Sequence, residues 1–179
     1  ALSGADAAAR RRSLSIFRVR MDLLLPVDCH PRIRSLYDYW ASRRCGRAMP
    51  GRADLDPIDI PSLLPNVFMV DVPPSGPMTY RVFGTALVAL FGRELTGRPL
   101  GEGVLPQAVA EVLSRYGRIV AEQRPFYHRA RLFEQGNDFT EVERVILPLS
   151  TDGVQVDQLI GMTIPRAAPA PGFRRLGLS

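Results

Sequence analysis

Lysine is absent from the 179-residue sequence, and cysteine and histidine occur only twice each. The net charge of +5 therefore comes from 23 arginines set against 18 acidic residues. Cys29 and Cys45 are too few and too far apart for a disulfide framework or a zinc centre, so we expect two reduced thiols. The arginines are scattered among the acids, and the sequence therefore does not predict a nucleic-acid partner.

Long apolar runs are missing as well. No segment reaches the roughly 18 residues that a membrane-spanning helix needs. Arg18, Arg20 and Asp22 interrupt the one N-terminal stretch that resembles a signal peptide. We therefore expect a cytoplasmic protein without a membrane partner.

Catalytic signatures are also lacking. The sequence has no G-x-S-x-G elbow, no G-x-x-x-x-G-K-[ST] phosphate loop and no G-x-G-x-x-G dinucleotide motif. Glu141 and Glu143 lie two apart in a strand pattern and share a face, which indicates an exposed polar sheet surface more than a catalytic pair. We predict no catalytic residue, no metal ligand and no enzyme activity.

What the sequence does contain is a clear succession of helix and strand patterns. Apolar residues at helical spacing predict helices over 31–46, 85–91 and 106–123. Runs of branched and aromatic residues predict strands over 66–72, 79–83, 126–134, 139–149 and 156–164. The helices gather between the second and third strands, which makes the fold class α+β, with one antiparallel sheet covered by helices on one face.

Several residues have predicted structural roles. Trp40 lies on the apolar stripe of the first helix and is expected to be buried on the sheet or on a second subunit. Thr85 is expected to cap the second helix, and Leu113 to lie on the apolar stripe of the third. In Arg52-Ala53-Asp54-Leu55-Asp56-Pro57 the carboxylates can cap the next one-turn helix, and Arg52 can pair with one of them.

Four motifs in this order resemble a bacterial family of single-domain PAS-like sensory proteins. They are LYDYW at 36–40, MPGRADLDPIDIPSLLPNVFMVDV at 49–72, YRVFGT at 80–85 and GRELTGRPL at 92–100. The resemblance implies a five-stranded sheet in the order 2-1-5-4-3, an N-terminal flanking helix and a sensory or regulatory role. The resemblance covers roughly residues 33–164. From the sequence pattern we expect the domain at 31–165, after an N-terminal tail at 1–30 with a short helix from residue 13 onward. A disordered tail follows at 166–179.

The resemblance also implies where a ligand would bind. In PAS domains the pocket lies between the inner face of the sheet and the helices that follow the second strand. The candidate ligand-binding residues are Tyr80, Phe83, Leu87, Leu90, Phe91, Tyr116 and His128. A filled core built from the same residues is the open alternative, and the sequence names no cofactor.

Three functions remain open. The first is a sensory module that binds a small molecule, and the second is a module that makes only protein contacts, as a homodimer or with a signalling partner in trans. The third is a small-molecule enzyme on a related α+β fold, because fold alone does not exclude chemistry. No kinase, cyclase or DNA-binding output domain appears in the sequence, so signalling is expected to pass through another protein or through dimerisation.

Overall fold

The structure is a computed structural model that describes residues 25–102, 104–133 and 139–166. The short helix expected before residue 25 and the tail beyond residue 166 lie outside the described residues. We expected residues 1–30 to precede the domain. The described part of that segment instead contributes Leu25 and Cys29 to the hydrophobic core.

The predicted elements recur in the described residues with small changes of boundary. The α-helices are α2 (Pro31–Ser42), α3 (Thr85–Phe91) and α4 (Val109–Glu122). Single 3-10 turns are η1 (Arg52–Asp54), η2 (Pro57–Asp59), η3 (Leu64–Asn66) and η4 (Pro106–Ala108). The strands are β1 (Val67–Asp71), β2 (Thr79–Phe83), β3 (Phe126–Phe133), β4 (Phe139–Leu149) and β5 (Gln158–Pro165).

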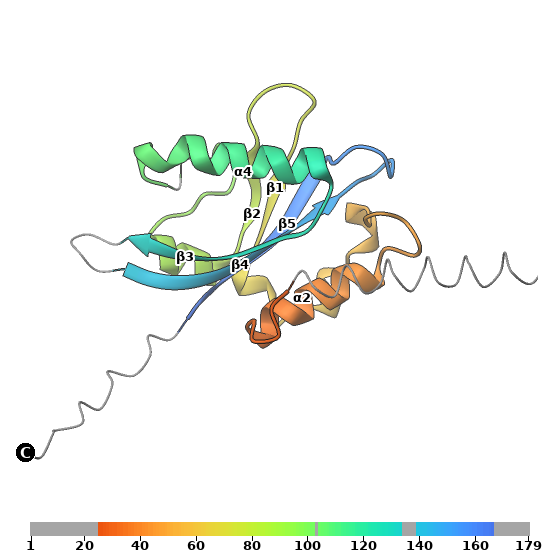
Figure 1. Ribbon diagram of the computed structural model, residues 1–179, viewed down its shortest axis with the longest axis horizontal. Coiled ribbons are helices and arrows are strands. Elements are labelled where there is room, and N and C mark those ends of the chain that lie inside the picture. The colour runs from red at the N-terminus through yellow and green to blue at the C-terminus, as the bar shows by residue number, and fades with distance from the viewer. Residues whose placement is uncertain (1–24, 103, 134–138, 167–179) are drawn as a thin grey trace, which may run out of the picture.

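The five strands form one sheet in the order β2-β1-β5-β4-β3, with every neighbouring pair antiparallel. The predicted strand order is therefore confirmed. Residues that pair directly share a face of the sheet, so the register divides the sheet into two faces. We call the face toward α3 and α4 the inner face and the face toward α2 the outer face. Figure 1 shows α4 above the sheet and α2 below it.

Helix α2 is docked on β4 and β5 through its apolar stripe. His30 caps the helix, since its Nδ1 accepts the backbone N–H of Arg32 at 3.1 Å. Trp40 is only 1% exposed, and its Nε1 donates to the backbone oxygen of Pro148 at 2.9 Å. The predicted burial of Trp40 is thus confirmed, with the sheet of its own chain as the surface that covers it.

The proline-rich stretch after α2 is held by the two aspartates predicted to cap it. Asp54 accepts the backbone N–H of Gly51 at 2.7 Å, and Asp56 caps η2. The predicted pairing of Arg52 with a carboxylate is wrong. Arg52 donates to the backbone oxygen of Leu55 at 2.7 Å, because η1 turns its side chain back along its own loop. The residues of this motif therefore stabilise the loop between α2 and β1.

The start of α3 differs from the prediction that Thr85 caps it. Gly84 is the N-cap residue, and Thr85 is the first residue within the helix. A Cβ atom on Gly84 would lie 2.4 Å from the backbone oxygen of Pro65, so only glycine allows the two segments to approach this closely. The contact fixes α3 against η3, beside the end of β2.

Helix α4 buries a narrower stripe than its sequence pattern predicts. Tyr116 and Ile119 are buried, whereas Leu113 is 43% exposed. The prediction that Leu113 faces the core is wrong, because α4 meets the sheet along one line of residues and Leu113 lies beside that line. Tyr116 is 2% exposed and interacts electrostatically with Tyr80 and Arg144 of the sheet, and this places α4 over the candidate site.

Candidate functional site

Three polar residues lie side by side across the inner face of the sheet. His128 on β3 pairs directly with Arg144 on β4, and Arg144 pairs directly with Thr163 on β5. Arg144 Nε donates to Thr163 Oγ1 at 2.8 Å, which orients the guanidinium. We call these three residues the polar row. The adjacent row on the same face is apolar and runs through Phe126, Ile146, Gly161, Phe68 and Phe83.

Arg144 is a half-buried cation that makes no ion pair with any described residue. Its guanidinium carbon lies 5.8 Å from the centre of the Phe68 ring. That ring can lie flat against the sheet only because residue 161 is glycine. A Cβ atom there would lie 2.2 Å from a Phe68 ring carbon. The sheet therefore presents a positive charge beside an aromatic surface.

His128 is neutral and has one nitrogen without a partner. Arg115 Nη1 lies 3.4 Å from His128 Nε2, and because a guanidinium can only donate, Nε2 is the acceptor. Burial and the charges of Arg144 and Arg115 lower the pKa of His128 to about 3. The proton of the neutral ring is then on Nδ1, which is buried and has no hydrogen-bond partner in the described part of the chain.

Two tyrosines complete the polar surroundings of the row. Burial raises the pKa of Tyr80 and, more strongly, that of Tyr116, which is 2% exposed. The positive charge of Arg144 lowers both pKa values in part, so its guanidinium lies within electrostatic range of both side chains. Both hydroxyls stay protonated at neutral pH and can donate hydrogen bonds.

The residues predicted to line the site fall into two groups and one outlier. Tyr80, Phe83 and Phe91 form a chain of edge-to-face rings with centroids 5.2 and 5.6 Å apart, and Leu87 is fully buried. Tyr116 and His128 lie around Arg144, as described above. Leu90 is half-buried and does not belong to the core cluster or to the residues packed against it.

Sequence reasoning missed Arg144, Thr163 and Arg115. A signal for Arg144 was present, because β4 alternates and Arg144 falls on the same face as Val142 and Ile146. An arginine between two apolar residues of one face indicates a charge turned toward the interior. No comparable pattern marks Thr163, whose hydroxyl resembles that of any strand threonine.

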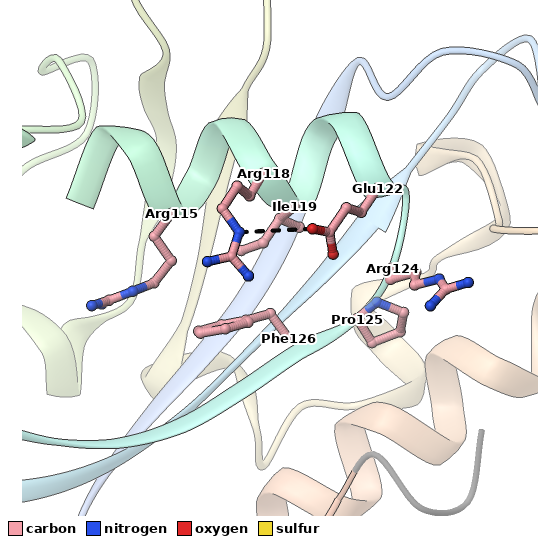
Figure 2. Close-up of a pocket in the computed structure, with 7 residues that line it drawn as sticks. All are labelled: Arg115, Arg118, Ile119, Glu122, Arg124, Pro125 and Phe126. Atoms are coloured by element: carbon pink, nitrogen blue, oxygen red, sulfur yellow. Dashed lines mark ion pairs between the residues drawn. The ribbon is translucent and has the colours of Figure 1, made fainter. Parts of the chain in front are cut away.

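A shallow hollow opens beside the polar row, between the last turns of α4 and the start of β3. Figure 2 shows Arg115 and Arg118 reaching over it from the helix, with Phe126 beneath them. It encloses about 20 Å³, enough for about one water molecule. The Phe126 ring lies 5.2 Å from the His128 ring, and the Arg115 guanidinium lies 5.9 Å from the Phe126 ring. The hollow therefore borders the two side chains that cover His128.

The outer face carries a separate polar cluster centred on Glu143. We expected this carboxylate on an exposed surface, but it is 3% exposed because α2 covers this side of the sheet. Glu143 Oε2 accepts the backbone N–H of His30 at 2.8 Å and the Tyr127 hydroxyl at 3.0 Å. Arg166 and Arg129 approach Oε1 at 3.5 and 3.7 Å. Burial, with the bond to Glu143, raises the pKa of Tyr127 to about 12.

The described residues contain no group of three or more metal-ligating side chains and no helix long and apolar enough to cross a membrane. Both cysteines are free, with Cys29 buried and Cys45 exposed.

Solved structures with a similar architecture include PAS and LOV domains. The PAS domain of BvgS from Bordetella pertussis superposes with a TM-score of 0.50 at 18% identity, covering 63% of this chain and 85% of that one. A PAS domain from Colwellia psychrerythraea gives 0.46 at 14% identity, covering 62% and 98%. The Rhodobacter sphaeroides LOV protein gives 0.45 at 11% identity, covering 62% and 68%.

No protein with a curated record matches the sequence. At 18% identity the BvgS domain shows the fold alone. The family itself is shown by the sequence, because residues 29–164 match the family model described as PAS domain. That match runs from the start of α2 to the end of β5, across both faces of the sheet, and the chain therefore belongs to the PAS domain family, whose members are generally sensory modules.

Proposed function

We propose that this PAS domain binds a small molecule on the inner face of its sheet, beside the polar row. The observation that carries the proposal is the buried Nδ1–H of His128, which has no acceptor among the described residues. A buried donor without a partner costs about 1–3 kcal/mol, and native proteins rarely leave one unexplained. A ligand that supplies the acceptor would remove this cost.

The surroundings of His128 have the composition of a ligand site. Such sites are mostly apolar with a few placed polar groups. The apolar walls we propose are Phe83, Leu87, Phe91 and the ring of Tyr116, with Leu90 at the margin and Tyr80 and His128 as polar contacts. The hollow between Arg115 and Phe126 is the entrance that we assign to the site.

Strands β4 and β5 offer a route by which binding could be transmitted. They carry Arg144 and Thr163 on the inner face, and α2 packs on their outer face. The backbone oxygen of Pro148, on the same strand as Arg144, accepts the hydrogen bond of Trp40. A shift of β4 on ligand binding would therefore change the contact with α2.

Signal output requires a second protein surface. We propose a homodimer, or a signalling partner in trans, as the recipient, because PAS domains commonly dimerise. Light scattering on the full chain is expected to give a dimer at micromolar concentration. A monomer under those conditions would contradict the homodimer and leave the partner in trans.

An enzyme on this fold is the weaker candidate. A general base works best with a pKa near the working pH, whereas the pKa of His128 is lowered to about 3. The buried carboxylate of Glu143 lies on the opposite face of the sheet from His128. The inner face thus offers donors for binding, and no acid–base pair supports catalysis there.

A metabolite screen by thermal shift tests the proposal. Ala130 follows His128 on the same face of β3, so Ala130→Trp would fill the space beside the row. The control is Arg131→Trp, because Arg131 is exposed on the other face and its ion pair with Glu141 at 3.6 Å contributes little. Leu90→Trp is the second blocking variant, placed at the margin of the site.

The expected result is a metabolite that raises the melting temperature of the wild type and of Arg131→Trp, but not that of Ala130→Trp. A compound that stabilises Ala130→Trp as much as the wild type binds elsewhere. If every stabilising compound behaves in this way, the inner face is not a ligand site.

A further inference from the structure

Resting on the proposed ligand site, we infer that its ligand is a small monocarboxylate, held by Arg144 and His128 against the aromatic surface of Phe68 and Tyr80. The first support is an excess of hydrogen-bond donors. The two Nη atoms of Arg144 and Nδ1–H of His128 have no acceptor in the described part of the chain. The hydroxyls of Tyr80 and Tyr116 are further protonated donors nearby.

The second support is the balance of charge. Arg115, which covers His128, is already paired with Glu111 one helical turn earlier. Arg144 is the remaining cation of the inner face and makes no ion pair with the described residues. One uncompensated positive charge matches one carboxylate. A phosphate dianion would leave a negative charge in a half-buried place.

The third support is geometric. Thr163 Oγ1 holds the Nε of Arg144, which fixes the plane of the guanidinium and leaves its two Nη atoms for a ligand. A fixed guanidinium fork suits the two oxygens of a carboxylate. His128 is the direct cross-strand neighbour of Arg144, so Nδ1–H can serve the same anion.

The fourth support is the apolar surface next to the charge. The rings of Phe68 and Tyr80 meet edge to face at 6.2 Å, and Phe83 continues the surface. Arg144 stands over the Phe68 ring. Phe68 and Phe83 are 2% and 7% exposed, so the aromatic or aliphatic body of a carboxylate on the guanidinium packs on these rings only after it displaces the side chains that cover them. Burial of its apolar area then adds affinity.

Titration calorimetry at pH 7 with acid and amide pairs tests the inference. The probes are phenylacetate with phenylacetamide, benzoate with benzamide, and hexanoate with hexanamide. At least one acid is expected to bind about tenfold or more tightly than its amide, because a hydrogen-bonded charge pair is lost in the amide. Inorganic phosphate, tested separately, is expected to bind more weakly than that acid.

Variants locate the anion. Arg144→Met is expected to weaken binding of the acid about tenfold or more, and His128→Phe to weaken it severalfold. Arg131→Met is the matched control, an arginine on the outer face of the neighbouring strand, and should bind like the wild type. If circular dichroism shows that Arg144→Met is unfolded, Arg144→Gln takes its place.

The outcomes separate this inference from the proposed function. If acids and amides bind equally and Ala130→Trp abolishes both, the ligand site stands and the carboxylate inference is overturned. The carboxylate inference is also overturned if phosphate binds more tightly than every acid and Arg144→Met weakens phosphate binding as well. If no acid binds at about 10 mM, the inference is also overturned. If acids bind Ala130→Trp and the wild type equally, the inner-face site itself fails.

Discussion

Replacement of Glu143 by alanine tests how α2 is held on the sheet. The carboxylate accepts hydrogen bonds from the backbone N–H of His30 and from the hydroxyl of Tyr127. Its Oε1 also lies 3.7 Å from Arg129 and 3.5 Å from Arg166. Glu143→Ala would leave the half-buried His30 N–H and Tyr127 hydroxyl without this acceptor.

The expected loss follows from the contacts. A hydrogen bond to a charged group contributes about 1.5–3 kcal/mol, so the two lost hydrogen bonds cost about 3–6 kcal/mol. The contacts to Arg129 and Arg166 add little, because these side chains are 37% and 36% exposed. Arg129 keeps Asp28 as a partner at 2.8 Å, so the total should not exceed that range. We expect a loss of about 3–5 kcal/mol for Glu143→Ala and about 1–2 kcal/mol for Glu143→Gln, which keeps one acceptor oxygen.

Urea unfolding followed in two ways measures this loss. Trp40 is the only tryptophan of the chain, and its fluorescence reports the docking of α2, while far-UV circular dichroism reports the whole fold. Glu141→Ala is the control, since Glu141 lies on the same face of β4 and has one weak ion pair, to Arg131 at 3.6 Å. If Glu143→Ala and Glu141→Ala unfold at the same urea concentration, the cluster does not hold the helix.

Three further perturbations have defined outcomes. Trp40→Ala should lower the free energy of unfolding by about 3–5 kcal/mol in urea, and an unchanged value would show that α2 is not docked. Gly161→Ala should cost about 1–3 kcal/mol because its Cβ displaces the Phe68 ring, and Phe68→Leu in the same chain should recover part of it. Folding lowers the pKa of His128 from 6.5 to about 3, so as the pH falls the unfolded chain binds a proton before the folded chain does. Between pH 6.5 and about pH 3 the free energy of unfolding therefore falls by up to about 1.4 kcal/mol for each unit of decreasing pH. His128→Phe should flatten this slope, and equal slopes in the two chains would contradict the lowered pKa.

The element pattern could be predicted because it depends on local signals, and the strand order because the motifs resemble those of a known family. Branched and aromatic runs between turns marked each strand, and apolar spacing marked α2 and its buried Trp40. The motif resemblance then selected one order of strands from those compatible with the pattern. The predicted elements and the predicted strand order both agree with the structure.

The exposure of individual residues could not be predicted as well. Alternation shows which residues share a face, but it does not show that both faces of this sheet are covered. The burial of Glu143 depends on α2 crossing the outer face, which is a long-range contact between His30 and β4. The role of Gly84 likewise depends on a close approach to Pro65 that no local pattern reveals.

Only part of the candidate site was predicted, because the rest depends on contacts between strands that are distant in the sequence. Tyr80, Tyr116 and His128 were placed by analogy with the pocket of other PAS domains, and the structure sets all three around Arg144. Arg144 itself was overlooked, since its neighbours in the sequence make β4 look like an ordinary apolar strand. The register of β3, β4 and β5, which assembles the polar row, appears only in three dimensions.

Native mass spectrometry of the purified protein tests the central claim most directly. The account predicts a mass excess from a bound small molecule that is lost on denaturation and is absent from Arg144→Met and from His128→Phe. Arg131→Met, with its substitution on the outer face, should keep the excess. A bound molecule retained equally by all four proteins would contradict the claim that the polar row of the inner face is the ligand site.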